Sequence, residues 1–467
     1  MATTRPYRDL SFWLDALVTA GRDDLTPRPP LDGDTTADVC IVGAGLTGLW
    51  TAYALLERDP SLRIVIVEQE IAGFGASGRN GGWCSALFPR SGAALERMSG
   101  LPAASAMRAA MRDTVDEVGR VVATEGIDCD FVKGGTVLYA RSAVQDRAAR
   151  AEATESGRYG DRITYRPARD GDATESVGVA FDADCARVQP AALARGLAAV
   201  LEARGVVIAE RTPASSWAGA GPSGSAGPRG ASVVTPRGVV SAGAVVIAVE
   251  GYGSQIPQIR RSVLPLYSLM IATAPLPPDV WDRIGLEHGQ TFSDYRHLLV
   301  YGQRTADDRF AFGGRGARYH WGSTIDPAYD RAPQVFAHLR RTLGEMFPQI
   351  GDVPVTHTWG GPLGVPRDWC ASVTWDGSVG RAGGYVGDGL STTNLAGRTL
   401  ADLVLGVASP LVDLPWVNHR SPEWEPEPLR FLGANAGLVA TDIADREEQL
   451  TGRRSVAARL MGPLTGH

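Results

Sequence analysis

The pattern of apolar and polar positions organises residues 37–68 into a strand, a helix and a second strand. The apolar run at Val39, Ile41 and Val42 predicts a buried strand, and Ile64–Val67 predicts another. Between them, Thr47–Glu57 carries helix-forming residues with one apolar face. That face consists of Leu49, Ala52, Tyr53 and Leu56. The pattern therefore predicts a βαβ unit near the N-terminus.

The same periodicities predict elements along the rest of the chain. Helices are expected at 92–125, 143–156, 191–204, 333–347 and 442–460, with another ending at Leu405. Strands are expected at 206–209, 243–249, 265–273, 297–301, 309–314, 356–359 and 381–386, with a hairpin around 236–238. A further hairpin is expected from 130–132 and 136–139, turning through Lys133-Gly134-Gly135.

A glycine motif lies where the first strand meets the first helix. Gly43-Ala44-Gly45-Leu46-Thr47-Gly48 fits G-x-G-x-x-G, and the acid Glu68 follows the last glycine by twenty residues. The first glycine permits a tight turn, the second lets backbone approach a pyrophosphate, and the third lets the helix pack on the strand. The helix N-terminus favours anions, and Glu68 is placed to accept hydrogen bonds from a ribose. The spacing predicts a dinucleotide-binding domain.

The residues after Glu68 indicate which dinucleotide is bound. Gly75-Ala76-Ser77-Gly78 and Arg79-Asn80-Gly81-Gly82 place small and polar residues where backbone can lie against a flat ring. Here the chain resembles the FAD-dependent amine and amino-acid oxidoreductases of the D-amino-acid oxidase, glycine oxidase and sarcosine oxidase superfamily. The stretch GASGRNGG is most similar to the γ-glutamylputrescine oxidase branch, and the resemblance runs from about Phe12 to the C-terminal helix.

The resemblance implies an α/β fold, with a Rossmann-like FAD-binding domain of the glutathione-reductase type. An interleaved α+β substrate domain on a largely antiparallel sheet would complete it. The expected segments are an N-terminal arm (1–36), the FAD-binding domain (37–87, 181–259 and 356–410), the substrate domain (88–180 and 260–355) and a helical tail (411–467).

FAD is the implied cofactor, bound non-covalently because Trp359–Gly364 lacks the cysteine to which sarcosine oxidases attach their flavin. Ala214 is expected at the adenine, and the turn before the helix ending at Leu405 at the flavin edge that gains negative charge on reduction. The expected cofactor contacts are Gly43, Gly45, Leu46, Thr47, Gly48, Glu68, Gln69, Ala76, Ser77, Gly78, Arg79, Asn80, Gly81, Gly82, Ala214, Ala248, Gly251, Gly361, Gly387, Gly389, Leu390, Ser391 and Thr392.

Candidate catalytic and substrate residues come mainly from 313–321. Arg315 suits a carboxylate or phosphonate, and Trp321 suits an amine through stacking and cation–π contact. Arg315, His320 and Arg79 are the catalytic candidates, with Arg79 favouring the reduced flavin anion. The substrate candidates are Tyr267, Tyr301, Arg315, Trp321 and Trp359. The competing interpretations are an ion pair for Arg315, a satisfied polar residue for His320 and core packing for Trp321.

The predicted reaction oxidises the C–N bond of a small amine or amino acid to an imine, which water converts to an aldehyde or keto product. Electrons would pass to O2 with release of H2O2. Lysine is absent from 309–321, where relatives use one to activate oxygen, so a dehydrogenase with another electron acceptor is an alternative. A flavin monooxygenase, which would need a second nucleotide-binding unit, and a non-catalytic flavoprotein are two further alternatives.

Composition excludes several other classes. The net charge is −6, and the absence of a basic block argues against nucleic-acid binding. The five cysteines form no C-x-x-C pair, which argues against a zinc site or disulfide framework and fits a reducing cytoplasm. No apolar run reaches the length of a membrane span, so we expect a cytoplasmic protein without membrane partners. The pattern leaves monomer and dimer open.

Overall fold

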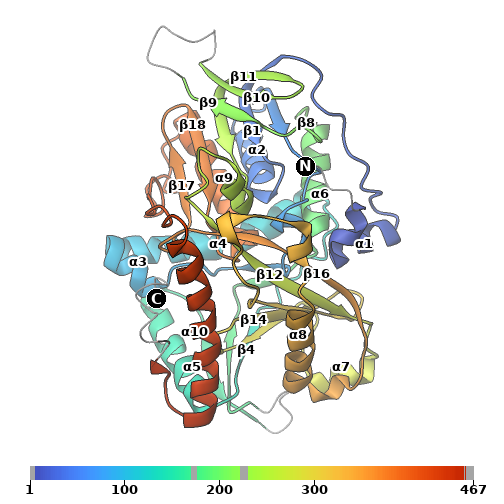
Figure 1. Cartoon of the computed structure of the whole chain (residues 1–467), viewed down its shortest axis with the longest axis vertical. Helices are drawn as coiled ribbons and strands as arrows, with labels where there is room; N and C mark the ends of the chain where they lie inside the picture. Colours follow the sequence, from blue (N-terminus) through green and yellow to red (C-terminus); the bar gives the residue numbers. More distant parts are fainter. Residues whose placement is uncertain (1–5, 170–175, 221–229, 457, 459–467) are drawn as a thin grey trace.

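A computed structural model describes residues 6–169, 176–220, 230–456 and 458. Two large sheets organise these residues, one in the upper and one in the lower half of Figure 1. The chain crosses between them several times, so each sheet is built from segments far apart in sequence. This α/β arrangement is the expected fold class.

The first sheet holds the predicted βαβ unit. Strands β1 (Thr35–Val42) and β2 (Ile64–Val67) pair in parallel, with α2 (Leu46–Arg58) as the crossover, as predicted. Its main path runs β17 (Ser372–Trp375), β18 (Val379–Gly383), β11 (Gly238–Ile247), β1 (Thr35–Val42), β2 (Ile64–Val67) and β8 (Val207–Ala209). Strands β10 (Ala231–Thr235) and β9 (Ser216–Ala218) extend it beside β11. From β18 to β8 every pair on this path is parallel, which brings the carboxyl ends of these strands to one edge.

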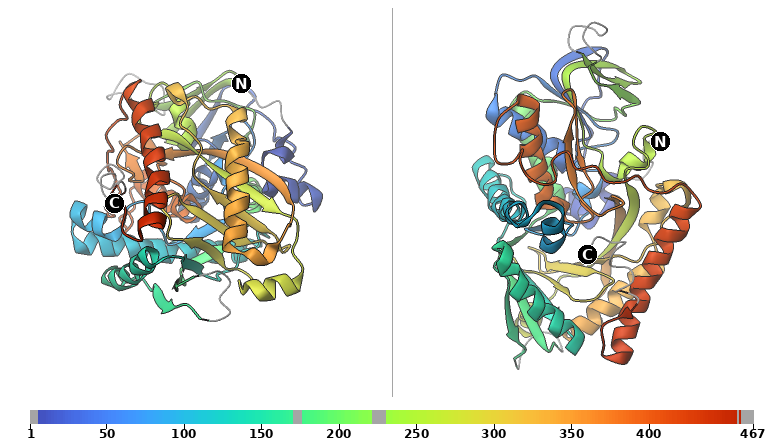
Figure 2. Two further views of the ribbon diagram at one scale, coloured as in Figure 1. Left: turned by 60° about the horizontal axis from the view of Figure 1, so that its bottom comes forward. Right: turned by 90° about the vertical axis from the view of Figure 1, so that its left-hand side faces the viewer.

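Helices pack on this sheet because packing removes their apolar faces from water. Helix α2 is buried along most of its length against α9 (Gly389–Leu405), and the principal core includes residues of both helices. The α-helices of the described residues are α1 (Phe12–Thr19), α2, α3 (Gly92–Ser99), α4 (Leu101–Glu125), α5 (Ala143–Ser156), α6 (Pro190–Ala203), α7 (Pro278–Ile284), α8 (Pro333–Met346), α9 (Gly389–Leu405) and α10 (Leu429–Thr451). Figure 2 shows α8 and α10 side by side on the outer face of the second sheet.

The second sheet is antiparallel except for one parallel pair, β13 with β4. Its order is β16 (Val355–Val365), β12 (Leu264–Thr273), β15 (Phe310–Gly314), β14 (Val300–Arg304), β13 (Thr291–Asp294), β4 (Thr136–Ala140), β6 (Gly178–Asp182) and β5 (Thr164–Pro167). A separate two-stranded sheet joins β3 (Trp83–Ser85) to β7 (Cys185–Arg187). Aromatic rings such as Phe292, Phe310 and Phe347 pack together in the core of the second sheet.

The predicted hairpin at 130–139 is wrong. Strand β4 pairs with β6 and β13, and Val132 makes only an isolated bridge to Arg187. A Cβ on Gly134 would lie 2.4 Å from the backbone carbon of Gly289. The glycines at 134–135 therefore permit a close approach of two chain segments and do not form a hairpin turn.

Several predicted elements have different bounds, and the helix expected at 92–125 is interrupted at Gly100, between α3 and α4. Strand β16 runs to Val365 and pairs along its length with β12, so the first sheet resumes only at β17. Strand β14 starts three residues later than expected, and α10 starts at Leu429 where the prediction placed a helix from 442. Residues 457 and 459–467 of the predicted tail lie outside the described part of the chain. The domain boundaries as such remain a prediction.

Among the residues described, no helix combines the length and the apolar character needed to cross a membrane.

Candidate active site

The glycine motif forms a tight loop between β1 and α2. Gly43 has φ +105°, and a Cβ there would lie 2.5 Å from the Ala248 carbonyl oxygen. A Cβ on Gly48 would lie 2.0 Å from the carbonyl oxygen of Gly43. At Gly45 a Cβ would meet only the Ser77 Oγ, at 3.0 Å. Gly43 and Gly48 are therefore required by packing, whereas Gly45 keeps backbone open beside the helix.

The N-terminus of α2 is available to an anion. Gly45 is its N-cap and supplies no side-chain hydrogen bond to the first turn. The Leu46 N–H donates to Ser77 Oγ at 2.8 Å, which ties the motif to the loop that follows β2. Thr47 Oγ1 and Tyr385 Oη lie 3.0 Å apart, which brings the residues before α9 to the same place.

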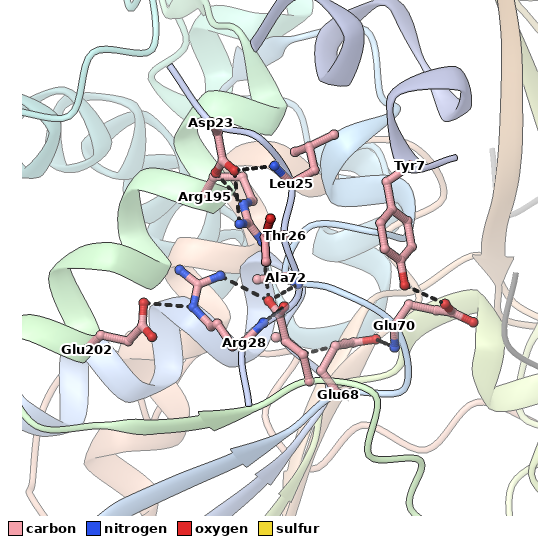
Figure 3. A network of polar contacts seen from close by, with 12 residues as sticks. Tyr7, Asp23, Leu25, Thr26, Arg28, Glu68, Glu70, Ala72, Arg195 and Glu202 are labelled. Carbon is pink, nitrogen blue, oxygen red and sulfur yellow. Dashed lines mark hydrogen bonds and ion pairs between the residues drawn. The ribbon is translucent and has the colours of Figure 1, made fainter. Parts of the chain in front are cut away.

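Glu68 lies at the carboxyl end of β2, beside the glycine loop (Figure 3). Its carboxylate accepts hydrogen bonds from the N–H groups of Ala44 (2.8 Å) and Glu70 (2.9 Å). Burial raises the pKa of Glu68 to about 7 despite these two bonds. Of its neighbours in the prediction, Gln69 is exposed and Ala214 is half-buried.

A second carboxylate nearby, Glu210, anchors the N-terminal arm, and sequence reasoning missed it. Its fully buried side chain accepts from the Ala72 N–H at 2.7 Å and pairs with Arg28 at 3.0 Å and Arg195 at 3.3 Å. Arg195 also pairs with Asp23 at 2.6 Å (Figure 3). The arm is thus fixed to α6 and to the loop after β2, and it completes this side of the dinucleotide-binding edge.

A cavity of about 120 Å³ lies where the loop after β2 and the N-terminus of α9 face the second sheet. Many of its lining residues were predicted as cofactor or substrate contacts, and several carry charge. The lining consists of Ala76, Arg79, Asn80, Gly81, Trp83, Ser85, Leu87, Ser268, Leu299, Tyr301, Arg315, Gly361, Leu363, Val386, Gly387, Asp388 and Leu390. The structure therefore brings together the loop after β2, the second sheet and the N-terminus of α9.

Arg79 is buried and its charge is balanced within the protein. Its Nη1 lies 2.8 Å from Asp330 Oδ2, and its Nε donates to the Phe74 carbonyl at 2.9 Å. The guanidinium also lies 4.6 Å from the centre of the Phe74 ring. Because Asp330 pairs with it, Arg79 supplies less net positive charge to the cavity than the sequence suggested.

Arg315 and Asp388 put opposite charges on the wall of the same cavity. Arg315 donates through Nη2 to the Val386 carbonyl and lies 5.3 Å from the Trp369 ring centre. Asp388 is the N-cap of α9 and makes no side-chain capping bond. Within the described chain, no ion pair at 4.0 Å or less joins the two. Burial raises the pKa of Asp388 to about 6, against the opposing charges of Arg315 and Arg108.

Four predicted substrate or catalytic residues lie outside the lining. Trp359 is buried and donates its Nε1–H to the Arg79 carbonyl at 2.8 Å. Tyr267 is buried edge-on against His320, whose ring stacks on Tyr329 with 3.3 Å between ring centres. Trp321 is 57% exposed and packs beside Phe431. Conversely, the sequence analysis did not name the Asp388 side chain as a site residue, although its position between Gly387 and Gly389 of the predicted flavin-edge turn pointed to it.

The described residues fit a dinucleotide that carries a flat ring. Two helices, α2 and α9, begin with glycine-rich turns and no side-chain bond from the N-cap residue. Apart from the Leu46 N–H, which donates to Ser77, the N–H groups of their first turns are available to negative oxygens. Glycines at 81, 361 and 387 keep side chains away from the wall of the cavity. The acid at the end of β2 completes the pattern expected for a ribose.

Comparison with known proteins agrees with this geometry. The family model described as FAD dependent oxidoreductase matches residues 38–403. The chain belongs to this family. As an FAD-dependent oxidoreductase it uses FAD as its cofactor, as the resemblance carried by residues 75–82 implied.

Relatives of this FAD-dependent oxidoreductase cover most of its length. It is 30% identical over 397 residues to the probable oxidoreductase OrdL of Rhizobium meliloti, covering 82% of this chain and 86% of that protein. It is 28% identical over 398 residues to the γ-glutamylputrescine oxidoreductase of Escherichia coli, covering 83% and 88%. The crystal structure of glycine oxidase from Geobacillus kaustophilus has the same fold, with TM-score 0.68, 19% identity and 82% and 99% coverage.

Proposed function

We propose that this FAD-dependent oxidoreductase oxidises the carbon–nitrogen bond of a small amine or amino acid. The substrate loses a hydride from carbon and a proton from nitrogen, and the C–N bond becomes C=N. Bound FAD supplies the two-electron acceptor for that hydride. Water then adds to the imine and releases an aldehyde or keto product together with the amine nitrogen. We further propose that FAD is held non-covalently and that O2 takes up its electrons as H2O2.

The observation that supports this proposal is the pair of opposite charges on one cavity wall. Arg315 keeps guanidinium N–H groups near the cavity, which suits a carboxylate or another anionic group of the substrate. Asp388 offers carboxylate oxygens to a substrate ammonium. Because hydride leaves an amine only when its nitrogen is neutral, Asp388 is also placed to take the ammonium proton. The name of the Escherichia coli relative, a γ-glutamylputrescine oxidoreductase, supports an amine substrate.

The first test is an anaerobic screen of the flavin-loaded protein against amines, amino acids, polyamine derivatives and aminophosphonates. We expect at least one of these compounds to bleach the visible absorbance of the oxidised flavin. Repeating the hits in air with peroxide detection separates an oxidase from a dehydrogenase. If no amine bleaches the flavin while NADPH alone does, the proposal is wrong and a monooxygenase replaces it.

Asp388→Asn is expected to remove the pH dependence of amine binding between about pH 5 and 7. In the unmodified protein the Asp388 carboxylate ionises as pH rises through about 6, so affinity for an ammonium ligand should increase over that range. The charged or titratable groups facing it are Arg315, Arg108 and Tyr301, none of which changes charge there. Loss of the carboxylate should weaken binding roughly 10- to 100-fold at pH 7.5, as for a charge-assisted hydrogen bond.

Ligand affinity is measured from the perturbation of the flavin spectrum by a non-oxidisable amine, across the pH range. Asp388→Glu keeps the carboxylate and should keep the pH dependence. Asp413→Asn, an exposed residue outside the cavity, is the matched control for loss of one negative charge. An unchanged pH profile in the asparagine variant would assign the ammonium to another group.

A further inference from the structure

A second cavity, of about 250 Å³, lies behind the wall of the first. Its wall includes the end of β11, the residues 259–263 that lead into β12, and the segment 419–421. The chain runs from this cavity, at 381–384, directly into the wall of the first cavity, at 386–388. The two cavities are therefore separate but share one short stretch of backbone.

A half-buried guanidinium without an ion pair is the central feature of this second cavity. Arg381 donates one hydrogen bond, from Nη2 to Ser262 Oγ, and no carboxylate of the described residues lies within ion-pair distance. A guanidinium carries five N–H donors, and burial lowers the pKa of Arg381 because its charge is poorly solvated. A buried cation is stable only when it is paired or hydrogen-bonded, so the remaining donors call for acceptors.

The nearest acid does not supply those acceptors. Glu250 accepts from the N–H groups of Gly364 at 2.6 Å, Gly384 at 3.1 Å and Tyr385 at 3.1 Å. Its carboxylate is thus used to hold three backbone segments together. The Glu250 carboxylate acts on Arg381 only through electrostatic attraction from beyond ion-pair distance.

Other residues of the lining add positive charge and hydroxyl groups. The hydrogen bond of His419 to Asp368 raises the pKa of His419 to about 10, so this side chain is a cation at neutral pH. Arg420 is exposed at the same segment, and Ser262, Ser372 and Thr374 bring hydroxyl groups to the wall. Asp368 balances His419, which leaves two arginines against the single carboxylate of Glu250 in the lining.

We propose that this second cavity binds a small molecule through a phosphate group, with Arg381 as the principal ligand. Guanidinium and hydroxyl groups together match the oxygens of a phosphate, and the volume leaves room for more than the anion alone. Glu250 fixes the backbone at 384–385, and this backbone leads to Asp388. A molecule bound in the second cavity is therefore placed to change the position of Asp388 in the substrate cavity.

The test uses the FAD-loaded protein, so that the phosphate-binding part of the dinucleotide site is already filled. Inorganic phosphate and pyrophosphate are titrated by calorimetry at constant ionic strength, with chloride as the balancing anion. We expect saturable binding of one anion per chain, weakened at least 10-fold by Arg381→Gln and less by Arg381→Lys. Arg283→Gln, which removes an exposed cation of α7, should leave the affinity unchanged.

Two outcomes overturn the proposal. One is the absence of saturable binding beyond what chloride produces. The other is competition between phosphate and an amine ligand, detected in the flavin spectrum, that persists undiminished in Arg381→Gln, which would place the anion in the first cavity. If Arg381→Gln does not fold, Arg420→Gln at the exposed segment replaces it and should weaken phosphate binding at least 3-fold. Because no substrate is needed, these results are independent of whether the protein oxidises amines.

Discussion

Arg79→Met is expected to destabilise the protein by about 3–5 kcal/mol, the usual cost of removing one partner of a buried ion pair. Arg79 and Asp330 have side chains that are 3% and 8% exposed, and their charged atoms are 2.8 Å apart. Without the arginine, the Asp330 carboxylate stays buried beside an apolar side chain. The Phe74 and Gly360 carbonyls also lose the N–H groups that Arg79 donates to them.

The free energy of unfolding in urea, measured on the apoprotein, checks this prediction. The double variant Arg79→Met/Asp330→Leu should recover part of the loss, because both charges of the pair are then removed from the interior. Arg283→Met breaks the exposed pair with Asp279 and serves as the matched control, with an expected effect below about 1 kcal/mol. Strictly additive effects of the two single changes would contradict the pairing.

Gly48→Ala and Gly45→Ala are expected to fail in different ways. At position 48 the new Cβ would lie 2.0 Å from the Gly43 carbonyl oxygen and 3.1 Å from Ile41. Helix α2 must then move away from β1, and overpacking of this kind costs about 3 kcal/mol. At position 45 the only close atom is Ser77 Oγ, at 3.0 Å, so the apoprotein should keep its stability within about 1 kcal/mol. Its FAD affinity should instead fall at least about 10-fold, because the methyl group occupies space beside the uncapped helix.

Thermal unfolding of the apoprotein and quenching of FAD fluorescence measure the two effects separately. Gly433→Ala is the control for a glycine inside a helix, since a Cβ there meets nothing within 4 Å. It should stabilise α10 by about 0.5–1 kcal/mol and leave FAD binding unchanged. Equal loss of FAD affinity and of apoprotein stability at position 45 would contradict the separate roles assigned to these glycines.

The elements predicted best are those whose signal is local. Residues 37–68 contain strand, glycine turn, helix, strand and acid within one short stretch, and all of them are found there. The hairpin at 130–139 failed because Gly134 serves a contact with Gly289, which lies far away in sequence. Strand β16 was predicted too short because glycines, as at 360, 361 and 364, have little preference for strands. Pairing with β12 keeps these residues in the strand.

The sequence by itself determined the dinucleotide-binding unit, because glycine spacing and the acid after β2 act within one local unit, and the resemblance of residues 75–82 identified the family and FAD. It did not determine which side chains face the cavity. Strand β15 ends at Gly314, so no strand periodicity fixes the directions of residues 315–321. Contacts with the distant α10 region decide them, as where Tyr319 bonds to Asn435 and Glu427. Arg315 and Asp388 likewise line one cavity because of contacts between distant segments. The second sheet and the start of α9 form one cavity wall only after the chain has folded.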